Sequence, residues 1–314
     1  MIGYLVRHLL QGLLTLVLVT LIVFVLVNVA PGGPASIMRP DMTPAERQAL
    51  AVQLGLDRPL PVRYVAWLRG AVMGNLGTSL SSNLPVNGQI AQRLPNTAEL
   101  AILTLIVSVG LGIVLGIAAA RRRGHIVDYL VNVVSVAGLS VPVFWFALLL
   151  ILLFSVTWHW LPASGMSMGS SFDVGDRALH AVMPVLVLSL ATLPTVIRFA
   201  RSSMLEALAQ DYVRTARSKG LANVRIVYGH VLRNALIPVI SIVGVLVPRL
   251  LGGAVITETV FGWPGMGQLM VQAASDRDYP MVMGITVVMT FAVVVMNLAV
   301  DLLYSVVDPR VRVT

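Results

Sequence analysis

The chain has no cysteine and few charged residues. Only 11% of its 314 residues are Asp, Glu, Lys or Arg, against about 25% in soluble domains. Without cysteine it can form no disulfide, no thiolate nucleophile and no cysteine-ligated metal site. The five histidines are scattered, and no two lie three or four residues apart. A helical histidine pair that could bind a metal ion is therefore absent.

Familiar catalytic and nucleotide-binding patterns are also missing. The phosphate-binding pattern G-x-x-x-x-G-K-[ST] does not occur, and the only lysine, Lys219, lies between Ser218 and Gly220. Neither H-E-x-x-H nor G-x-S-x-G is present, which removes the chemistry of two hydrolase groups. Ser218 and Lys219 would point apart on a helix and form no Ser–Lys pair. We therefore expect no enzyme, and no catalytic, cofactor-binding or metal-ligating residue in this chain.

What the sequence does contain is long apolar runs. Hydrophobic residues make up 57% of the chain and the mean hydropathy is +0.87, values typical of membrane proteins. A helical span needs about 20 mostly apolar residues. We expect an all-α membrane protein with six transmembrane helices, over residues 9–30, 100–120, 131–158, 181–197, 235–256 and 281–300.

Several details qualify these runs. The first is longer than the apolar region of a secretory signal, so it is interpreted as an uncleaved span. The third contains Pro142, which is tolerated only where neighbours satisfy the freed carbonyl. The second contains Gly112 and Gly116, at a spacing that lets two helix backbones approach closely. The same spacing also arises by chance in glycine-rich spans.

Residues 31–95 form a long polar segment after the first span. The run T-P-A-E at residues 43–46 has the form of a capping box and predicts a helix that ends near Gly55. A second stretch, 62–73, is amphipathic and carries aromatic residues such as Tyr64, which favour the membrane–water boundary. We expect short helices that lie against the membrane or pack on the bundle.

The distribution of basic residues gives an orientation. Six spans would put both termini on one side, together with the segments after the second and fourth spans. The two termini and these two segments together hold most of the arginines, whereas the two short segments on the opposite side hold only Arg177 and Arg277. By the positive-inside rule both termini are expected in the cytoplasm. The net charge of +8 is then a topology signal and does not indicate nucleic-acid binding.

The longest polar insert on the expected cytoplasmic side covers residues 202–238. It predicts two helices around Gly220, over about 203–219 and 223–233, with glycine in the left-handed position after the first helix. A sharp helix–glycine–helix bend, with the small Ala216 on one face, can fit a groove on another protein. The alternative is a basic loop that is merely solvated.

Two stretches of this insert carry a family resemblance. Residues 211–221 read DYVRTARSKGL and residues 230–239 read HVLRNALIPV. They resemble the cytoplasmic loop of inner-membrane permease subunits of ATP-binding-cassette importers, in the peptide/nickel uptake group. Gly220 takes the glycine position of that loop. Only one alanine of its Glu-Ala-Ala form is kept and its late proline is lost, but both departures match the peptide group's own variant.

Further stretches fit the same group, so the resemblance covers nearly the whole chain. One departure is Asn75, which replaces the usual aspartate in G-N-L-G-T-S. The other matching stretches lie at residues 55–68, 161–165, 252–267, 277–280 and 301–310.

The resemblance implies a type I importer permease fold and a set of partners. Residues 1–95 would hold the first span and an extracytoplasmic segment, 96–308 the permease core with a coupling loop at 199–235, and 309–314 a cytoplasmic tail. The partners would be a second homologous permease, two ATP-binding subunits that carry ATP and Mg, an extracytoplasmic substrate-binding protein and membrane lipid, with no nucleic acid. The location would be the bacterial inner membrane.

The function implied is half of the translocation pathway for di- or oligopeptides in a binding-protein-dependent importer. Nickel chelates, metallophores or glutathione remain alternative substrates for the same architecture. An ion-coupled transporter or channel is an alternative of another class, although it would require buried carboxylates in the spans. The residues expected to couple to the ATPase subunit are Asp211, Tyr212, Arg214, Thr215, Ala216, Arg217, Lys219, Gly220 and Leu221.

Arg249 lies inside the fifth expected span. An ionisable residue at such depth is a functional hypothesis by default, and a guanidinium there could contact the carboxylate of a substrate in the pathway. The alternative is a structural role, with Arg249 paired to a carbonyl or to a carboxylate of the partner permease.

Overall fold

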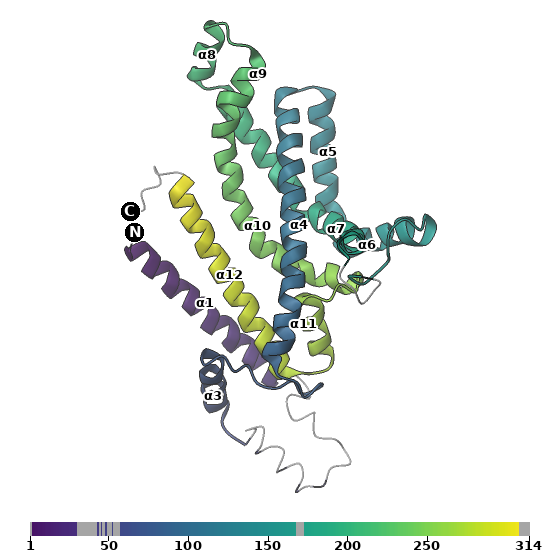
Figure 1. Cartoon of the computed structure of the whole chain (residues 1–314). Coiled ribbons are helices and arrows are strands. Elements are labelled where there is room, and N and C mark those ends of the chain that lie inside the picture. The colour runs from purple at the N-terminus through teal and green to yellow at the C-terminus, as the bar shows by residue number, and fades with distance from the viewer. Residues whose placement is uncertain are drawn as a thin grey trace. The chain divides into compact units, whose positions relative to one another are not determined.

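The computed structural model describes residues 2–29, 57–167 and 173–307, with positions 43, 45, 48 and 52 between the first two ranges. The helix expected after the T-P-A-E run falls outside these ranges. The described helices (Figure 1) are α1 (Ile2–Val29), α3 (Leu60–Val72), α4 (Val86–Arg121), α5 (Ile126–Ser140), α6 (Val143–Leu150), α7 (Val174–Leu208), α8 (Asp211–Ser218), α9 (Asn223–Ile226), α10 (Leu232–Val260), α11 (Met266–Ser275) and α12 (Tyr279–Val307). Two π-helical segments, η2 (Ile151–Thr157) and η3 (Val227–Val231), follow α6 and α9.

Five of the described helices are long and apolar enough to cross a membrane, namely α1, α4, α7, α10 and α12. A sixth span can form only from α5 together with α6 and η2, which are bent by 103° at their junction. The described residues thus agree with an all-α protein of five or six spans. The third span was expected over 131–158, and the structure divides this stretch into two helices that meet at Pro142. Val141, directly before Pro142, is extended (φ −84°, ψ 126°), because proline clashes with a helical residue before it.

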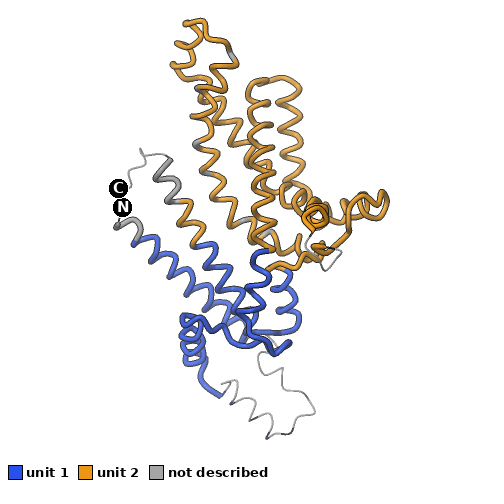
Figure 2. The backbone as a smooth tube through the Cα atoms, viewed as in Figure 1, with its two compact units in different colours: residues 1–95, 268–294 blue, residues 96–267, 295–314 orange. Residues whose placement is uncertain are grey.

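The chain divides into two compact units, shown in Figure 2. Unit 1 comprises residues 1–95 and 268–294. Unit 2 comprises residues 96–267 and 295–314.

In unit 1 the amphipathic helix α3 packs on α1. Tyr64 is buried, and its hydroxyl lies 3.0 Å from the Thr20 hydroxyl and donates to the Val17 carbonyl oxygen at 3.1 Å. The Phe24 ring meets the Tyr64 ring edge-on at 5.4 Å between centroids. The expectation that this stretch packs on the bundle is therefore confirmed for α3.

A buried aspartate organises the second half of unit 1. Asp278 accepts hydrogen bonds from the Ser79 hydroxyl, from the Leu80 backbone N–H at 3.1 Å and from the Ser81 hydroxyl at 3.0 Å.

The Asn75 side-chain oxygen accepts from the Gly77 N–H at 2.9 Å. An aspartate oxygen could accept the same bond, so asparagine at this position preserves the turn.

In unit 2 the backbones of α4 and α7 approach closely. A Cβ atom at Gly112 would lie 2.5 Å from Cγ1 of Val196, and one at Gly116 would lie 2.6 Å from Cβ of Ala200. Further along the same pair of helices, the Ser108 and Thr192 hydroxyls lie 2.6 Å apart. The small-residue spacing predicted a close helix contact, and the contact is confirmed.

An ion pair joins α5 to α7. Asp128 is only 6% exposed, and Arg201 donates from Nε at 2.6 Å and from Nη2 at 2.8 Å to its two carboxylate oxygens. Gly124 N–H and the Asn132 amide, at 3.1 and 3.0 Å, also donate to Asp128. A buried carboxylate is tolerated when it is paired and hydrogen-bonded in this way.

The C-terminal end of α10 is fixed by a further buried carboxylate. Glu258 is fully buried, and it accepts from the Thr97 hydroxyl and from the Gly267 N–H, each at 2.7 Å. A Cβ at Gly265 would collide with this carboxylate. Gly265 and Gly267 thus leave room for the Glu258 side chain.

The approach of α4 to α7 can be tested with a matched pair of substitutions. Gly112→Val should destabilise the protein by about 1–3 kcal/mol, because the new side chain overlaps Val196. Gly110 lies on the same helix, and its Cβ position has no atom within 4 Å, so Gly110→Val is the control and should melt like the wild type. Thermal unfolding in detergent measures both. Equal melting temperatures for the two variants would contradict the close approach.

Candidate functional site

The polar segment between α7 and α10 folds as a compact bend, and we refer to residues 209–231 as the elbow (Figure 1). One continuous helix over 203–219 was expected, and this is wrong. Helix α7 ends at Leu208, and Gln210 is extended (φ −72°, ψ 150°) before α8 begins at Asp211. The interruption lets α8 change direction, so that its two apolar residues can pack on the chain instead of facing solvent.

The second half of the elbow returns into the fifth span without a break. The expected helix over 223–233 is α9, followed by η3 and then by α10 from Leu232. Tyr228 of η3 meets the end of α4, since Arg121 donates to its hydroxyl at 3.4 Å and lies over its ring at 5.9 Å.

Gly220 ends α8 in the left-handed conformation, as the sequence predicted. Its φ is +75°, and its N–H bonds to the Arg217 carbonyl at 2.9 Å, while the Leu221 N–H bonds to the Ala216 carbonyl at 3.2 Å. These two bonds form a Schellman motif, which closes the last turn of a helix and needs a residue with positive φ. No atom lies within 4 Å of the Gly220 Cβ position, so conformation and not space favours glycine.

A buried apolar cluster holds the elbow on three helices, and we name it the elbow core. Val213 and Ala216 of α8 are its members from the outer turn, and Leu221 packs against it. The remaining buried members come from α4, α7, α9, η3 and α10: Ile117, Ala120, Met204, Ala207, Ile226, Val227, Val231 and Ala235. Apolar burial is therefore the main force that fixes the elbow.

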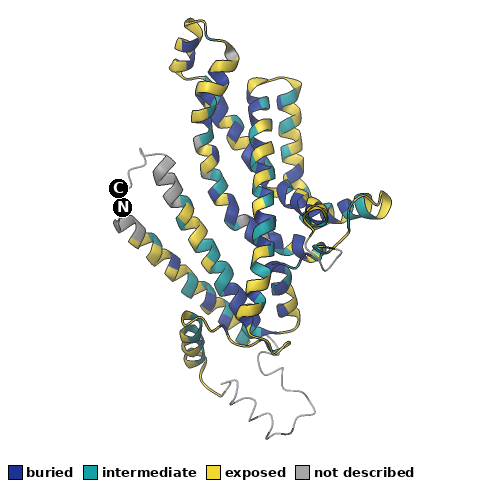
Figure 3. Ribbon diagram, in the orientation of Figure 1, coloured by how far each residue is buried: buried dark blue, intermediate teal, exposed yellow. Residues whose placement is uncertain are grey.

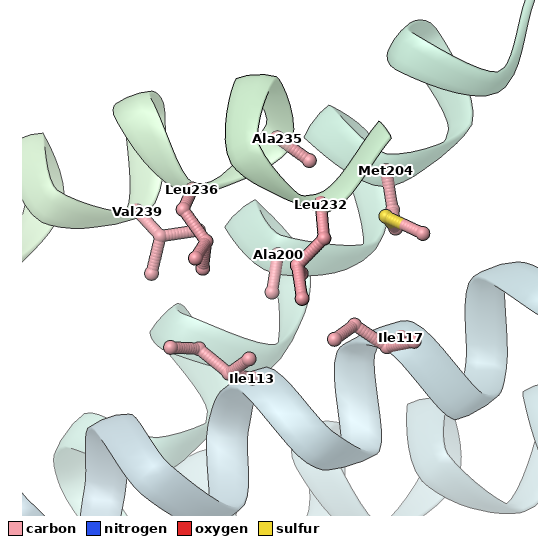
Figure 4. A pocket seen from close by; sticks show the side chains of 8 residues that line it. All are labelled: Ile113, Ile117, Ala200, Met204, Leu232, Ala235, Leu236 and Val239. Atoms are coloured by element: carbon pink, nitrogen blue, oxygen red, sulfur yellow. The ribbon is translucent and has the colours of Figure 1, made fainter. Parts of the chain in front are cut away.

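The apolar packing continues from the elbow core between α4, α7 and α10. Figure 4 shows an apolar pocket in which Ile113 and Ile117 face Leu232 and Leu236. Its other lining residues are also apolar: Ala200, Met204, Ala235 and Val239. The pocket offers no polar group to a solute, so we interpret it as a packing seam between the three helices.

The outward face of α8 is polar and contributes little to holding the fold. Asp211 and Arg214 form an ion pair at 3.8 Å whose side chains are 96% and 82% exposed, and such pairs contribute about 0–1 kcal/mol. Thr215, Arg217 and Lys219 are exposed as well. These side chains contribute little to the stability of the fold and are accessible to another protein.

Two of the residues expected to couple to the ATPase subunit do not lie on the outward face of α8. Ala216 is buried in the elbow core instead of facing outward, and Leu221 is half-buried against it. Tyr212 is exposed, and the Asn234 amide donates to its hydroxyl at 3.3 Å, which links α8 to α10. Sequence reasoning missed Val213, although its spacing of three residues from Ala216 is the signal of a buried helix face.

Two further expectations concern pathway and metal residues. Arg249 belongs to α10, but its side chain lies outside the described part of the chain. Among the described residues, no group of three or more His, Asp or Glu is placed to hold a metal ion.

Comparison with known sequences gives matches over the full length. The family model "Binding-protein-dependent transport system inner membrane component" matches residues 112–313, and its N-terminal companion model matches residues 1–101. The oligopeptide transport system permease protein AppB of Bacillus subtilis (strain 168) is 40% identical, over 99% of this chain and 100% of AppB. The dipeptide transport system permease protein DppB of Escherichia coli (strain K12) is 36% identical, over 99% of both chains.

Comparison with solved structures gives a more distant likeness. A chain of the MetNI methionine ABC transporter, in a structure of its inward-facing conformations, superposes with a TM-score of 0.54 at 17% identity. The match covers 70% of this chain and 96% of that one. At this identity the likeness concerns the fold alone.

Gly220 offers a test of the elbow's geometry. Gly220→Val should strain the closing turn by about 1–2 kcal/mol, because β-branched residues tolerate the left-handed region poorly. Gly220→Asn is the control, since asparagine adopts this conformation more readily. Hydrogen exchange of the purified permease should show faster exchange of α8 amides in the valine variant and near-normal exchange in the asparagine variant. Identical protection in all three proteins would show that the turn does not depend on glycine.

Proposed function

Because this chain belongs to the family of binding-protein-dependent transport system inner membrane components, we infer that it is the permease subunit of an ATP-driven importer of peptides. The observation that carries this inference is similarity along the whole chain to permeases of oligopeptide and dipeptide transport systems. The fold is that of a type I importer permease, and the chain is a multi-pass protein of the inner membrane. Its role is transport, with ATP hydrolysis assigned to partner subunits.

The elbow is the part of this chain that docks on an ATPase subunit. The exposed groups Asp211, Arg214, Thr215, Arg217 and Lys219 form the contact face, and Ala216 and Leu221 support that face from beneath. Tyr212 links it to α10, and Gly220 sets the turn. Displacement of α8 is transmitted to α4, α7 and α10 together, since a packed apolar cluster moves as a body and does not deform continuously.

The remaining partners follow from the same division of labour. A second homologous permease completes the pathway, two ATP-binding subunits dock beneath the pair, and an extracytoplasmic binding protein delivers the solute. Both termini and the elbow lie on the cytoplasmic side, which the distribution of arginines supports. The chain's own side chains hold no cofactor, and ATP with Mg is bound by the ATPase subunits.

Arg249 serves the pathway by attracting the carboxylate of a passing peptide. Arg249→Leu should lower uptake of unmodified peptides more than uptake of peptides with amidated C-termini, with the assembled complex intact. Arg249→Lys, which keeps the charge, should retain a larger share of the uptake. Uptake in proteoliposomes measures all three proteins. If Arg249→Leu took up unmodified and amidated peptides as well as the wild type does, Arg249 would not have this role.

The docking role of the exposed face can be tested by reversing its charge. Arg214→Glu with Arg217→Glu should abolish most co-purification of the ATPase subunits and ATP-driven uptake, because both side chains lie on the outward face of α8. The fold should be preserved, since neither residue belongs to the elbow core. Affinity purification of the tagged permease measures the amount of bound ATPase.

A matched control is the double variant Arg58→Glu with Arg69→Glu, which reverses two exposed arginines near α3. Its ATPase content should equal that of the wild type. Wild-type ATPase content in the elbow variant, or equal loss in both variants, would contradict docking through the α8 face.

A further inference from the structure

The connection between α4 and α5 presents exposed arginines that nothing in the described chain neutralises. Arg122 and Arg123 are exposed, and no hydrogen bond or ion pair joins either guanidinium to another described residue. The nearest carboxylate in sequence, Asp128, is engaged by Arg201, Gly124 and Asn132. Two neighbouring positive charges are thus left for a ligand that the protein does not supply.

Below these arginines α5 exposes an apolar face. Ile126 and Tyr129, in the first turn, are 68% and 67% exposed, and Val134 is 64% exposed. Figure 3 shows exposed positions along the helix. The other large apolar residues exposed on α5 are Leu130, Val133, Val136 and Leu139.

The length of this face matches one leaflet of a bilayer. Helix α5 has 15 residues, about 22 Å at a rise of about 1.5 Å per residue. One leaflet, with its headgroup region included, spans about 20–22 Å, half of a bilayer of about 40–45 Å. The 103° bend ends the straight face at that depth. A cationic head above an apolar strip of leaflet length suits an anionic phospholipid, with Tyr129 at the level where aromatic residues meet headgroups.

We propose that the α4–α5 connection and the exposed face of α5 form a binding site for an anionic phospholipid. The phosphate lies between Arg122 and Arg123, with His125 at the edge of the site, and an acyl chain follows α5 towards the bend. Clustered basic residues beside a membrane helix attract anionic headgroups in this way. The proposed cytoplasmic orientation determines only which leaflet supplies the lipid, and the site itself does not require the docking role of the elbow.

The site lies beside the elbow. Arg121, directly before the two free arginines, contacts Tyr228 of η3, and Figure 1 shows the α4–α5 connection at the same end of unit 2 as α8 and α9. The ion pair between Asp128, in the first turn of α5, and Arg201 fixes α5 to α7 next to the proposed site. A lipid bound here would therefore touch the helices that support the elbow core.

Site-specific fluorescence quenching can test the proposal. The chain has no cysteine, so Val133→Cys carries a single fluorophore on the exposed face of α5. The labelled permease is assembled with its partner subunits in phosphatidylcholine vesicles that contain brominated phosphatidylglycerol or, separately, brominated phosphatidylcholine. At equal mole fraction the anionic lipid should be preferred by about thirtyfold, as expected for two arginines near a membrane surface.

Two double variants decide whether the arginines are responsible. Arg122→Gln with Arg123→Gln should reduce the preference to near unity, with the quenching by brominated phosphatidylcholine unchanged. Arg58→Gln with Arg69→Gln, which removes two exposed arginines outside the elbow, should leave the preference as in the wild type. An unchanged preference in the first variant would overturn the site. Absence of quenching by either lipid in the assembled complex would also overturn it, because a partner protein would then cover α5.

Discussion

Apolar contact between α8 and the ends of three long helices is the interaction on which the candidate site depends. The outward side of α8 is charged and solvated, and its one ion pair is almost fully exposed. Val213 and Ala216 instead place α8 on the elbow core. Burying a valine side chain contributes about 1.5–3 kcal/mol, more than exposed ion pairs do. The elbow is therefore held from within, and its outward side chains are available to a partner.

Close helix packing extends this constraint into the spans. Gly112 and Gly116 bring α4 against α7, and the apolar seam of Figure 4 joins both helices to α10. The Asp128–Arg201 pair adds α5 to the same body. A force applied to α8 thus meets a set of helices that are already locked together by contact. This arrangement is compatible with the proposed docking role, in which a partner's movement would displace these spans together.

Local features of the fold could be predicted from the sequence. Hydropathy located the five long apolar helices, and the left-handed Gly220 followed from its position after a basic helix end, because both depend on residues close in the chain. The break at Gln210 and the inward direction of Ala216 were missed, since they depend on an apolar cluster assembled from distant segments. The pairing of Asp128 with Arg201 and the contact of Glu258 with Gly265 also depend on the folded chain, and the periodicity of the sequence cannot reveal them.

The most direct test of the account measures which side of α8 the ATPase subunit covers. Single cysteines can be placed in the cysteine-free chain at Arg217, on the exposed side, and at Val213, in the elbow core. The rate of maleimide labelling is then compared between the permease alone and the assembled importer. If the ATPase subunit covers the outward face of α8, labelling at position 217 should be fast in the permease alone and strongly suppressed in the assembled importer, whereas labelling at position 213 should be slow in both states. Equally fast labelling at position 217 with and without the ATPase subunits would contradict it.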